Sequence, residues 1–348
     1  MDRIKFIKMT AGLLPIPFLS GSLLAGSSKA QSPEPDAKIT VCPPYLKKGD
    51  QIGITSPSGY IFLNELLPAI KQLNSWGLQV KIGRTIGQRD GTFGGTDALR
   101  VQDFQEMLDD SAIKAILCAR GGYGAIRIID KIDFSRLRAN PKWVIGFSDA
   151  TVFHCHIATH CHVATLHSKM CNSFPDDWEK APALQKDTIL SIRDALMHTG
   201  KMEYKSIYNI YNRTGRVEGD LIGGNLRTIE NLSGTPSGIQ AAGKILFLEE
   251  THEYLYNMDR MLWNLKRSGQ LSHLKGLIIG AMVRQQQRNP ADELNRSIYD
   301  LVSEKTKTEN FPITFDFPVG HIINNFALKC GIRHTLEVSR QGTRLIEI

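Results

Sequence analysis

The chain has 348 residues, of which 42% are hydrophobic and 22% charged, and its formal net charge at pH 7 is +7. This balance excludes a disordered chain, and no stretch after the N-terminus approaches the roughly 20 consecutive apolar residues that span a bilayer. The basic residues form no stripe with interleaved aromatic side chains, so we predict no nucleic-acid partner.

The first thirty residues have the pattern of an export signal. Basic residues lie within 2–8, an apolar stretch covers 9–25, and small residues precede a cut after Ala30. We therefore predict a signal peptide over 1–30, a periplasmic protein, and no stable membrane insertion once the signal is removed. An uncleaved anchor or an untranslocated extension is the alternative. Residues 31–45, rich in Pro, Ser and Asp, are predicted to be a linker.

Strand-like and helical patterns alternate from residue 50 onward. Short apolar runs cover 51–55, 78–82, 113–118 and 143–147. Helical spacing follows these runs over 63–76, 97–108, 125–132 and 149–160. This alternation predicts an α/β fold, with a Rossmann-like parallel sheet in an N-terminal domain over 46–200.

The pattern changes in the second half of the chain. Strand-like runs at 244–248, 276–282 and 345–348 are separated by Gly-rich turns and by one helix at 257–266. We therefore predict a smaller, β-rich α+β domain over 201–348.

A candidate nucleophile follows the strand at 143–147. Ser148 lies in Gly146-Phe147-Ser148-Asp149-Ala150, between the end of that strand and the start of a helix. Small residues on both sides are typical of a nucleophile elbow, in which a tight turn exposes the hydroxyl and aims backbone N–H groups at the reaction centre. The alternative is a serine that only caps the helix.

Glycines at the end of the preceding strand supply candidate oxyanion donors. Gly121, Gly122 and Gly124 follow the run at 113–118, and glycine lets the backbone approach a ligand closely. A phosphate-binding loop or a plain turn is the alternative. Neither GxGxxG nor a Walker GK[ST] is present, which weakens the nucleotide interpretation.

A serine nucleophile needs a base and a group that orients it. His321 follows Pro318-Val319-Gly320 in a loop fixed by Pro and Gly, and Glu249 and Glu250 end an apolar strand. The order Ser, acid, His is compatible with a triad, although a solvated carboxylate and a hydrogen-bonded loop histidine remain alternatives. His156 and His160 share a helical face but fit no standard zinc spacing, so we predict no metal.

Taken together, several stretches resemble the L,D-carboxypeptidase family of serine peptidases, which includes muramoyl-tetrapeptide carboxypeptidases and microcin-immunity hydrolases. The matching stretches, in the order of the family, are 93–97, 120–124, 145–151, 219–226, 246–260 and 318–321. Six ordered matches are far more specific than any one of them.

The resemblance implies a role for each matching residue. Ser148 would be the nucleophile, His321 the general base and Glu249 the residue that orients it, while the amides of Gly122 and Asp149 would form the oxyanion hole. It further implies a site between the two domains, no cofactor, and a homodimer. The free carboxylate of the substrate requires a cationic or amide-rich pocket, for which Asn225 and Arg260 are the candidates.

The predicted reaction removes the terminal D-Ala from peptidoglycan tetrapeptides and leaves a tripeptide. A related hydrolase with a peptide-nucleotide substrate and a catalytically dead wall-binding protein are the alternatives. Two departures from the family pattern matter here. Glu250 stands where Asp is usual, which leaves open which of the two carboxylates takes the triad role. Residues 167–169 read His-Ser-Lys in place of a typical His-Gly-Pro, a change expected to alter substrate contacts.

Overall fold

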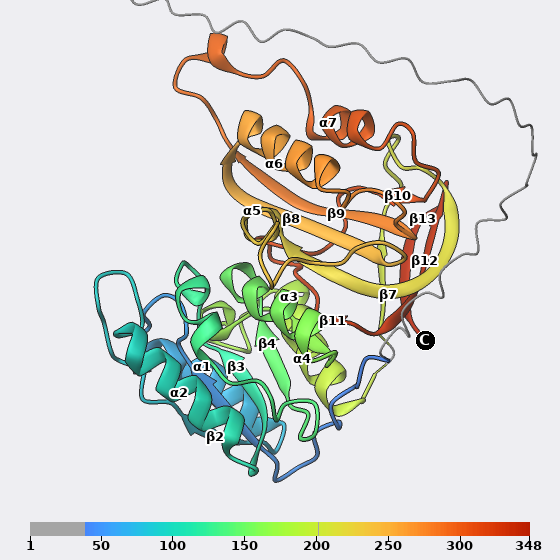
Figure 1. Ribbon diagram of the computed structural model, residues 1–348. Helices are drawn as coiled ribbons and strands as arrows, with labels where there is room; N and C mark the ends of the chain where they lie inside the picture. The colour runs from blue at the N-terminus through green and yellow to red at the C-terminus, as the bar shows by residue number, and fades with distance from the viewer. Residues whose placement is uncertain (1–38, 201) are drawn as a thin grey trace, which may run out of the picture. The chain divides into compact units, whose positions relative to one another are not determined.

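The computed structural model describes residues 39–200 and 202–348 (Figure 1). The predicted signal peptide over 1–30 and most of the predicted linker lie outside these residues. In the part of the chain that the structure describes, no helix has the length and apolar character needed to cross a membrane.

The first half of the chain forms a parallel sheet to which one strand from the second half is added. Its strands run in the order β11-β5-β4-β3-β1-β2, and β11 is antiparallel to β5. The strands are β1 (Gln51–Thr55), β2 (Gln79–Ile82), β3 (Ile113–Cys118), β4 (Trp143–Gly146), β5 (Thr165–His167) and β11 (Leu328–Cys330).

Helices cover both faces of this sheet because its strands are apolar on both sides. In β3, Ala115 and Leu117 pack in the same cluster as α1 (Leu63–Ser75) and α4 (Ala183–Met197). Residues of alternate register in β3 pack instead with α2 (Asp97–Asp109) and α3 (Thr151–His160). The predicted doubly wound, Rossmann-like arrangement is therefore confirmed.

The second half forms a mixed sheet of seven strands in the order β10-β9-β8-β7-β12-β13-β6. The strands are β6 (Glu203–Ser206), β7 (Gly215–Asn225), β8 (Ile245–Tyr254), β9 (Gly276–Gln285), β10 (Ile313–Thr314), β12 (Arg333–Ser339) and β13 (Gly342–Glu347). The four strands from β7 to β10 are parallel to one another, and the others pair antiparallel.

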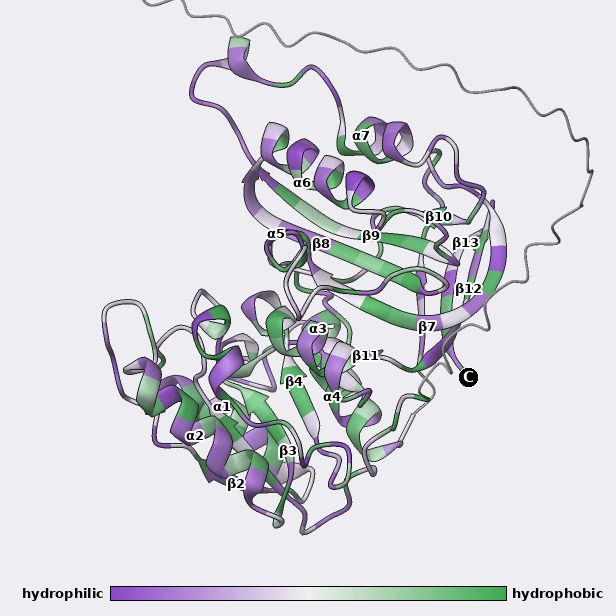
Figure 2. Ribbon diagram, in the orientation of Figure 1, coloured by the Kyte–Doolittle hydropathy of each residue, from purple (hydrophilic) through white to green (hydrophobic). Residues whose placement is uncertain are grey.

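Three helices belong to this second sheet: α5 (Leu226–Asn231), α6 (Leu255–Arg267) and α7 (Ile298–Lys305). Figure 1 shows α6 and α7 side by side over β8 and β9, and their apolar residues share one cluster with those strands. The hydrophobic centres of β8 and β9 stand out in Figure 2. Their opposite face packs against β12, β13 and the loop before residue 320.

Two predicted helices differ from the structure. Residues predicted helical over 125–132 form two short 3-10 helices, Ala125–Arg127 and Ile129–Lys131. The helix predicted from 149 begins with a 3-10 turn at Ser148–Ala150 before α3 starts. That 3-10 turn separates the candidate nucleophile from the regular helix.

Candidate active site

Ser148 occupies a tight turn immediately after β4. Its backbone φ of 61° lies in the left-handed region, which disfavours side chains other than glycine by about 1–2 kcal/mol. Its hydroxyl makes no hydrogen bond to any described residue, and the residue in the cap position of the 3-10 helix is Phe147. Ser148 is therefore not a helix cap, and such backbone strain at a half-buried polar residue is typical of functional sites.

The glycine loop after β3 lies against this serine. A Cβ added at Gly121 would lie 3.2 Å from the Ser148 Oγ, so the loop approaches the hydroxyl closely. Gly122 has a φ of 106°, and neither its N–H nor that of Gly121 has a hydrogen-bond acceptor among the described residues. The Asp149 N–H belongs to the first turn of a helix, where amides lack helical partners.

The Asp149 side chain ties these strand ends together rather than facing outward. Its Oδ2 accepts a hydrogen bond of 2.8 Å from the Ala125 N–H. Burial raises the pKa of the carboxyl group, while hydrogen bonds from Ser58 and Ala125 and the charge of Arg100 act in the opposite direction. Ser58, Ala125 and Asp149 follow β1, β3 and β4, so one carboxylate links three adjacent strand ends.

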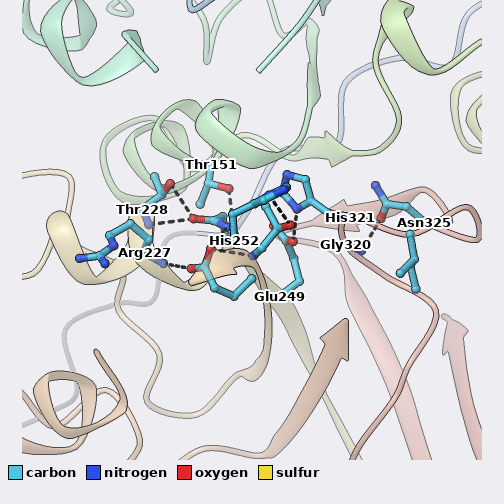
Figure 3. Close-up of polar contacts among 12 residues, drawn as sticks. Thr151, Arg227, Thr228, Glu249, His252, Gly320, His321 and Asn325 are labelled. Carbon is cyan, nitrogen blue, oxygen red and sulfur yellow. Dashed lines mark hydrogen bonds and ion pairs between the residues drawn. The ribbon is translucent and has the colours of Figure 1, made fainter. Parts of the chain in front are cut away.

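His321 meets a carboxylate from the second sheet. Its Nδ1 lies 2.7 Å from Oε2 of Glu249 in β8. Figure 3 shows the two side chains turned toward each other. The Glu249 side chain is fully buried, whereas the imidazole is 22% exposed. The imidazole ring also packs 4.8 Å from the ring of Phe147, which directly precedes the candidate nucleophile.

The loop that carries His321 is held from both sides. Gly320 has a φ of 114°, and a Cβ there would lie 2.7 Å from the Cβ of Glu249, so no larger residue fits. The Gly320 N–H donates to Asn325 Oδ1 at 2.8 Å, and His167 Nε2 donates to the same oxygen at 3.2 Å. Burial holds the pKa of His167 well below its usual value, so this histidine is neutral and distinct from His321.

The neighbouring carboxylate points elsewhere. Glu250 accepts hydrogen bonds from the Asn225 side chain and from the backbone N–H groups of Arg227 and Thr251, at 3.1, 2.7 and 2.8 Å. Burial raises its pKa, and these three hydrogen bonds lower it. The structure thus brings Glu249, and not Glu250, to the imidazole.

Asn225 is committed to the structure around Glu250. Its Oδ1 accepts from the Thr228 N–H at 3.1 Å and so caps α5, while its own N–H donates to Thr151 Oγ1 at 3.0 Å. With its Nδ2 on Glu250, this buried residue joins α3, β7 and β8. One amide hydrogen is left for a ligand.

Arg260, the other predicted carboxylate-binding residue, is not brought to this group. It lies exposed on α6, with its guanidinium 5.5 Å above the ring of Tyr256 on the same helix. No described contact joins it to Ser148, Glu249 or His321.

Two basic residues near the site are not among the predicted site residues. Lys169 donates to the carbonyl of Ile322 at 2.6 Å and lines a cavity beside His321. Arg100, fully buried in α2, donates to the carbonyls of Pro57 and Gly124. Each had a signal: Lys169 lies in a departure from the family pattern, and Arg100 falls on the apolar face of its helix.

No metal site is evident among residues 39–200 and 202–348, because no three His, Cys, Asp or Glu side chains converge there. His156, one of the histidines weighed as a metal ligand, instead pairs with the hydroxyl of Ser237 at 2.8 Å. Its ring packs 4.5 Å from that of His160.

The fold and the motifs can be compared with known proteins. The model of the LD-carboxypeptidase N-terminal domain matches residues 52–168, and that of the C-terminal domain matches 218–336. The chain is 31% identical to a probable murein peptide carboxypeptidase of Bacillus subtilis, across 88% of this chain and 94% of the relative. It is 29% identical to the murein tetrapeptide carboxypeptidase of Pseudomonas aeruginosa, across 83% and 94%.

Solved structures agree with these matches. The muramoyltetrapeptide carboxypeptidase from Oxalobacter formigenes is 27% identical, with a TM-score of 0.75 over 86% of this chain and 99% of that one. An MccF-like protein from Bacillus anthracis is 26% identical, with a TM-score of 0.75 over 88% and 99%. The chain is therefore a hydrolase that belongs to the LD-carboxypeptidase family.

Proposed function

We propose that the protein is a serine carboxypeptidase that removes the terminal D-Ala from peptidoglycan tetrapeptides, cutting the bond to the L-centre of the diamino acid. The observation that carries this proposal is the 2.7 Å contact between His321 Nδ1 and the buried Glu249, in a loop that packs against the residue before Ser148. Relatives named as murein peptide carboxypeptidases support the substrate class.

His321 acts as the base in this mechanism. Its Nδ1–H donates to Glu249, which fixes the tautomer whose Nε2 accepts a proton. The described residues include no hydrogen bond between Ser148 and His321. The imidazole must therefore approach the hydroxyl as substrate binds, since catalytic hydrogen bonds often tighten only in the substrate complex.

Bond formation and cleavage then follow the acyl-transfer sequence. The Ser148 oxygen bonds to the scissile carbonyl carbon as His321 takes its proton, and the N–H groups of Asp149 and Gly122 stabilise the oxyanion. The C–N bond breaks, His321 protonates the leaving amine, and free D-Ala departs. Water, deprotonated by His321, then cleaves the acyl-enzyme and releases the tripeptide.

The test is release of free D-Ala from purified tetrapeptide by the wild type and by Ser148→Ala. We expect release by the wild type, and a loss of at least about 10³-fold in the variant, because triad members act as a unit. Equal release by both proteins would exclude Ser148 as the nucleophile. If a fluorophosphonate labels Ser148 but no D-Ala is released, the enzyme acts on another acyl substrate. If there is neither labelling nor D-Ala release, the result would favour a wall-binding protein.

We also propose that the protein is exported to the periplasm and works there on the wall or its fragments. The support is the order of basic, apolar and small residues within 1–30. Mass spectrometry of the periplasmic protein should find an N-terminus at Gln31, and an intact N-terminus in the cytoplasm would contradict export.

The predicted homodimer is tested by light scattering during gel filtration.

A further inference from the structure

A cavity lies beside His321. It has a volume of about 860 Å³ and is lined by residues of 169–176, 184–189 and 321–324. Lys169 is the one Lys or Arg among these lining residues, and Asp176 at the exposed rim is the one carboxylate. The half-buried wall of the cavity therefore presents a positive charge close to His321.

Contacts on several sides hold the Lys169 ammonium in place. Its Nζ donates to the carbonyl of Ile322 at 2.6 Å and lies 5.6 Å from the centre of the Phe147 ring. Burial lowers the pKa of the amine, and the negative charge of Glu249 raises it. An ammonium group has three N–H donors, so two remain for a ligand after the bond to Ile322.

The position of Lys169 relative to His321 determines which part of a peptide it meets. In the proposed reaction His321 protonates the leaving amine, so the leaving residue must lie on the His321 side of the scissile bond. In a terminal D-Ala the carboxylate carbon is only two covalent bonds from that amine nitrogen. A cation bonded to the carbonyl of the residue after His321 therefore lies where this carboxylate must be held.

We propose that Lys169 binds the free C-terminal carboxylate of the substrate and so restricts the enzyme to removal of a terminal residue. This inference rests on the proposed function and names the group that recognises the chain end. It replaces the earlier candidates for this role, because Arg260 lies exposed on α6 and Asn225 is hydrogen-bonded to Glu250 and to the start of α5.

The experiment compares two tetrapeptides that differ only at the C-terminus, one with a free carboxylate and one with a primary amide. Cleavage of each is measured for the wild type, Lys169→Met, Lys169→Arg and Lys180→Met. Lys180 is a matched control, because its side chain is 87% exposed and pairs only with Asp177. The rate at which a fluorophosphonate labels Ser148 is measured in parallel. This rate depends on the reactivity of the triad, and the reagent has no carboxylate for Lys169 to bind.

The wild type should prefer the free acid by about 100-fold in kcat/KM, as expected for a partly desolvated, charge-assisted contact. For Lys169→Met, kcat/KM on the free acid should fall by this factor relative to the wild type. On the amide it should stay within about threefold of the wild-type value, and the rate of Ser148 labelling should be unchanged. Lys169→Arg should retain part of the preference, and Lys180→Met all of it.

Three outcomes would overturn the inference. In the first, Lys169→Met keeps the preference of the wild type for the acid. In the second, Lys169→Met slows both peptides and labelling equally, which would show that Lys169 only positions His321 through Ile322. In the third, the wild type cleaves acid and amide equally well. A wild type that labels at Ser148 but cleaves neither peptide would refute the proposed function as well, and so is distinguishable from the other three.

Discussion

His321 Nδ1 and Glu249 Oε2 lie 2.7 Å apart although 72 residues separate them along the chain. The carboxylate is fully buried in β8, and its second oxygen has no hydrogen-bond partner among the described residues. Such a buried carboxylate is strongly attracted to a positive charge on the imidazole, because the surroundings screen it poorly. Glu249 is therefore placed to stabilise the positive charge that develops on the imidazole as His321 takes the proton of the nucleophile.

Glu249→Gln tests this pairing. The substitution keeps the shape of the side chain but removes its charge, so the imidazole loses both its fixed tautomer and its stabilising partner. We expect kcat for D-Ala release to fall by about 10³–10⁴-fold, with little change in KM. Steady-state kinetics on the tetrapeptide measure this, and a fall of less than tenfold would exclude Glu249 from the triad.

Glu250→Gln is the matched control, because the two carboxylates are adjacent in sequence. Glu250 accepts from the Arg227 and Thr251 N–H groups and from Asn225, so its replacement places an amide against at least one donor. We expect a loss of about 1–3 kcal/mol in the free energy of unfolding and a nearly unchanged kcat. A large fall in kcat without destabilisation would reverse the roles of the two residues.

Gly320→Ala should separate the imidazole from its carboxylate. The new Cβ would lie 2.7 Å from the Cβ of Glu249 and 2.9 Å from its Oε2, so the loop that carries His321 must shift. We expect kcat to fall by about 100-fold or more, because small displacements of catalytic groups have effects of this size. Kinetics and the rate of fluorophosphonate labelling should fall together.

Gly269→Ala distinguishes this clash from backbone strain alone. Gly269 also has a positive φ, of 81°, but a Cβ there would meet nothing within 4 Å. This variant should lose about 1 kcal/mol of stability and keep full activity. If Gly320→Ala behaved in the same way, the close approach to Glu249 would have no role in catalysis.

The sequence predicts β1 and β3 with the bounds that the structure has, because both are apolar runs that end in turn residues. It fails over 125–132, where we expected one helix. Several β-branched isoleucines weaken helix formation in this segment, and Asp149 holds the Ala125 N–H in a tertiary contact. Such a contact between distant segments leaves no mark in local periodicity. For the same reason the sequence does not predict β11, a three-residue strand from the far end of the chain that pairs with β5.

In the candidate site, too, some features can be predicted from the sequence and others depend on tertiary structure. Its Ser, Glu and His residues are visible in the sequence because Ser148 follows an apolar strand, Glu249 comes directly after an apolar run, and His321 lies in a loop fixed by Pro and Gly. The strand itself continues past Glu249, to Tyr254. The choice between Glu249 and Glu250 depends on which side of β8 faces the loop at 320, which only tertiary packing decides. Lys169 and Arg100 stand out in the sequence only as unusual residues. Their role depends on the backbone carbonyls that they bind, and such acceptors have no sequence signature.

His154 makes the fold sensitive to acid. It is fully buried, its Nε2–H donates to the carbonyl of Gly146 at 2.9 Å, and its Nδ1 accepts from Thr165. Burial lowers the pKa from 6.5 to about 4, so an unfolded chain binds this proton at pH values where the folded protein does not. The stability contributed by neutral His154 is therefore present above pH 6.5 and lost as the pH falls toward 4.

Urea unfolding of the wild type and His154→Gln at two pH values isolates this effect. Between about pH 7 and pH 5 the free energy of unfolding of the wild type should fall by about 2 kcal/mol more than that of the variant. The other buried histidines are common to both proteins, so their contribution cancels in this difference. His273→Gln, at an exposed position, should behave like the wild type. Equal pH dependence of wild type and His154→Gln would show that His154 does not remain neutral.

Arg100 joins the loops that surround Ser148. Its guanidinium donates to the carbonyls of Pro57 at 2.5 Å and Gly124 at 2.9 Å, and pairs with Asp97. These carbonyls follow β1 and β3, and a Cβ at Gly124 would lie 2.6 Å from the guanidinium. Because the oxyanion loop ends at Gly124, we infer that Arg100 fixes the direction of the Gly122 N–H without touching substrate.

Arg100→Met should therefore act on turnover more than on substrate affinity. We expect kcat to fall by about 10–100-fold with KM nearly unchanged, together with a loss of about 1–3 kcal/mol in stability. The buried carbonyl of Pro57 loses its donor, whereas that of Gly124 keeps the Arg127 N–H at 3.1 Å. Arg127→Met is the control, since Arg127 shares the Asp97 partner but its side chain is 46% exposed and contacts neither carbonyl. Kinetics measured at temperatures where the variant is fully folded separate the effect on turnover from the effect on stability. A variant that is destabilised but turns over at the wild-type rate would limit Arg100 to a structural role.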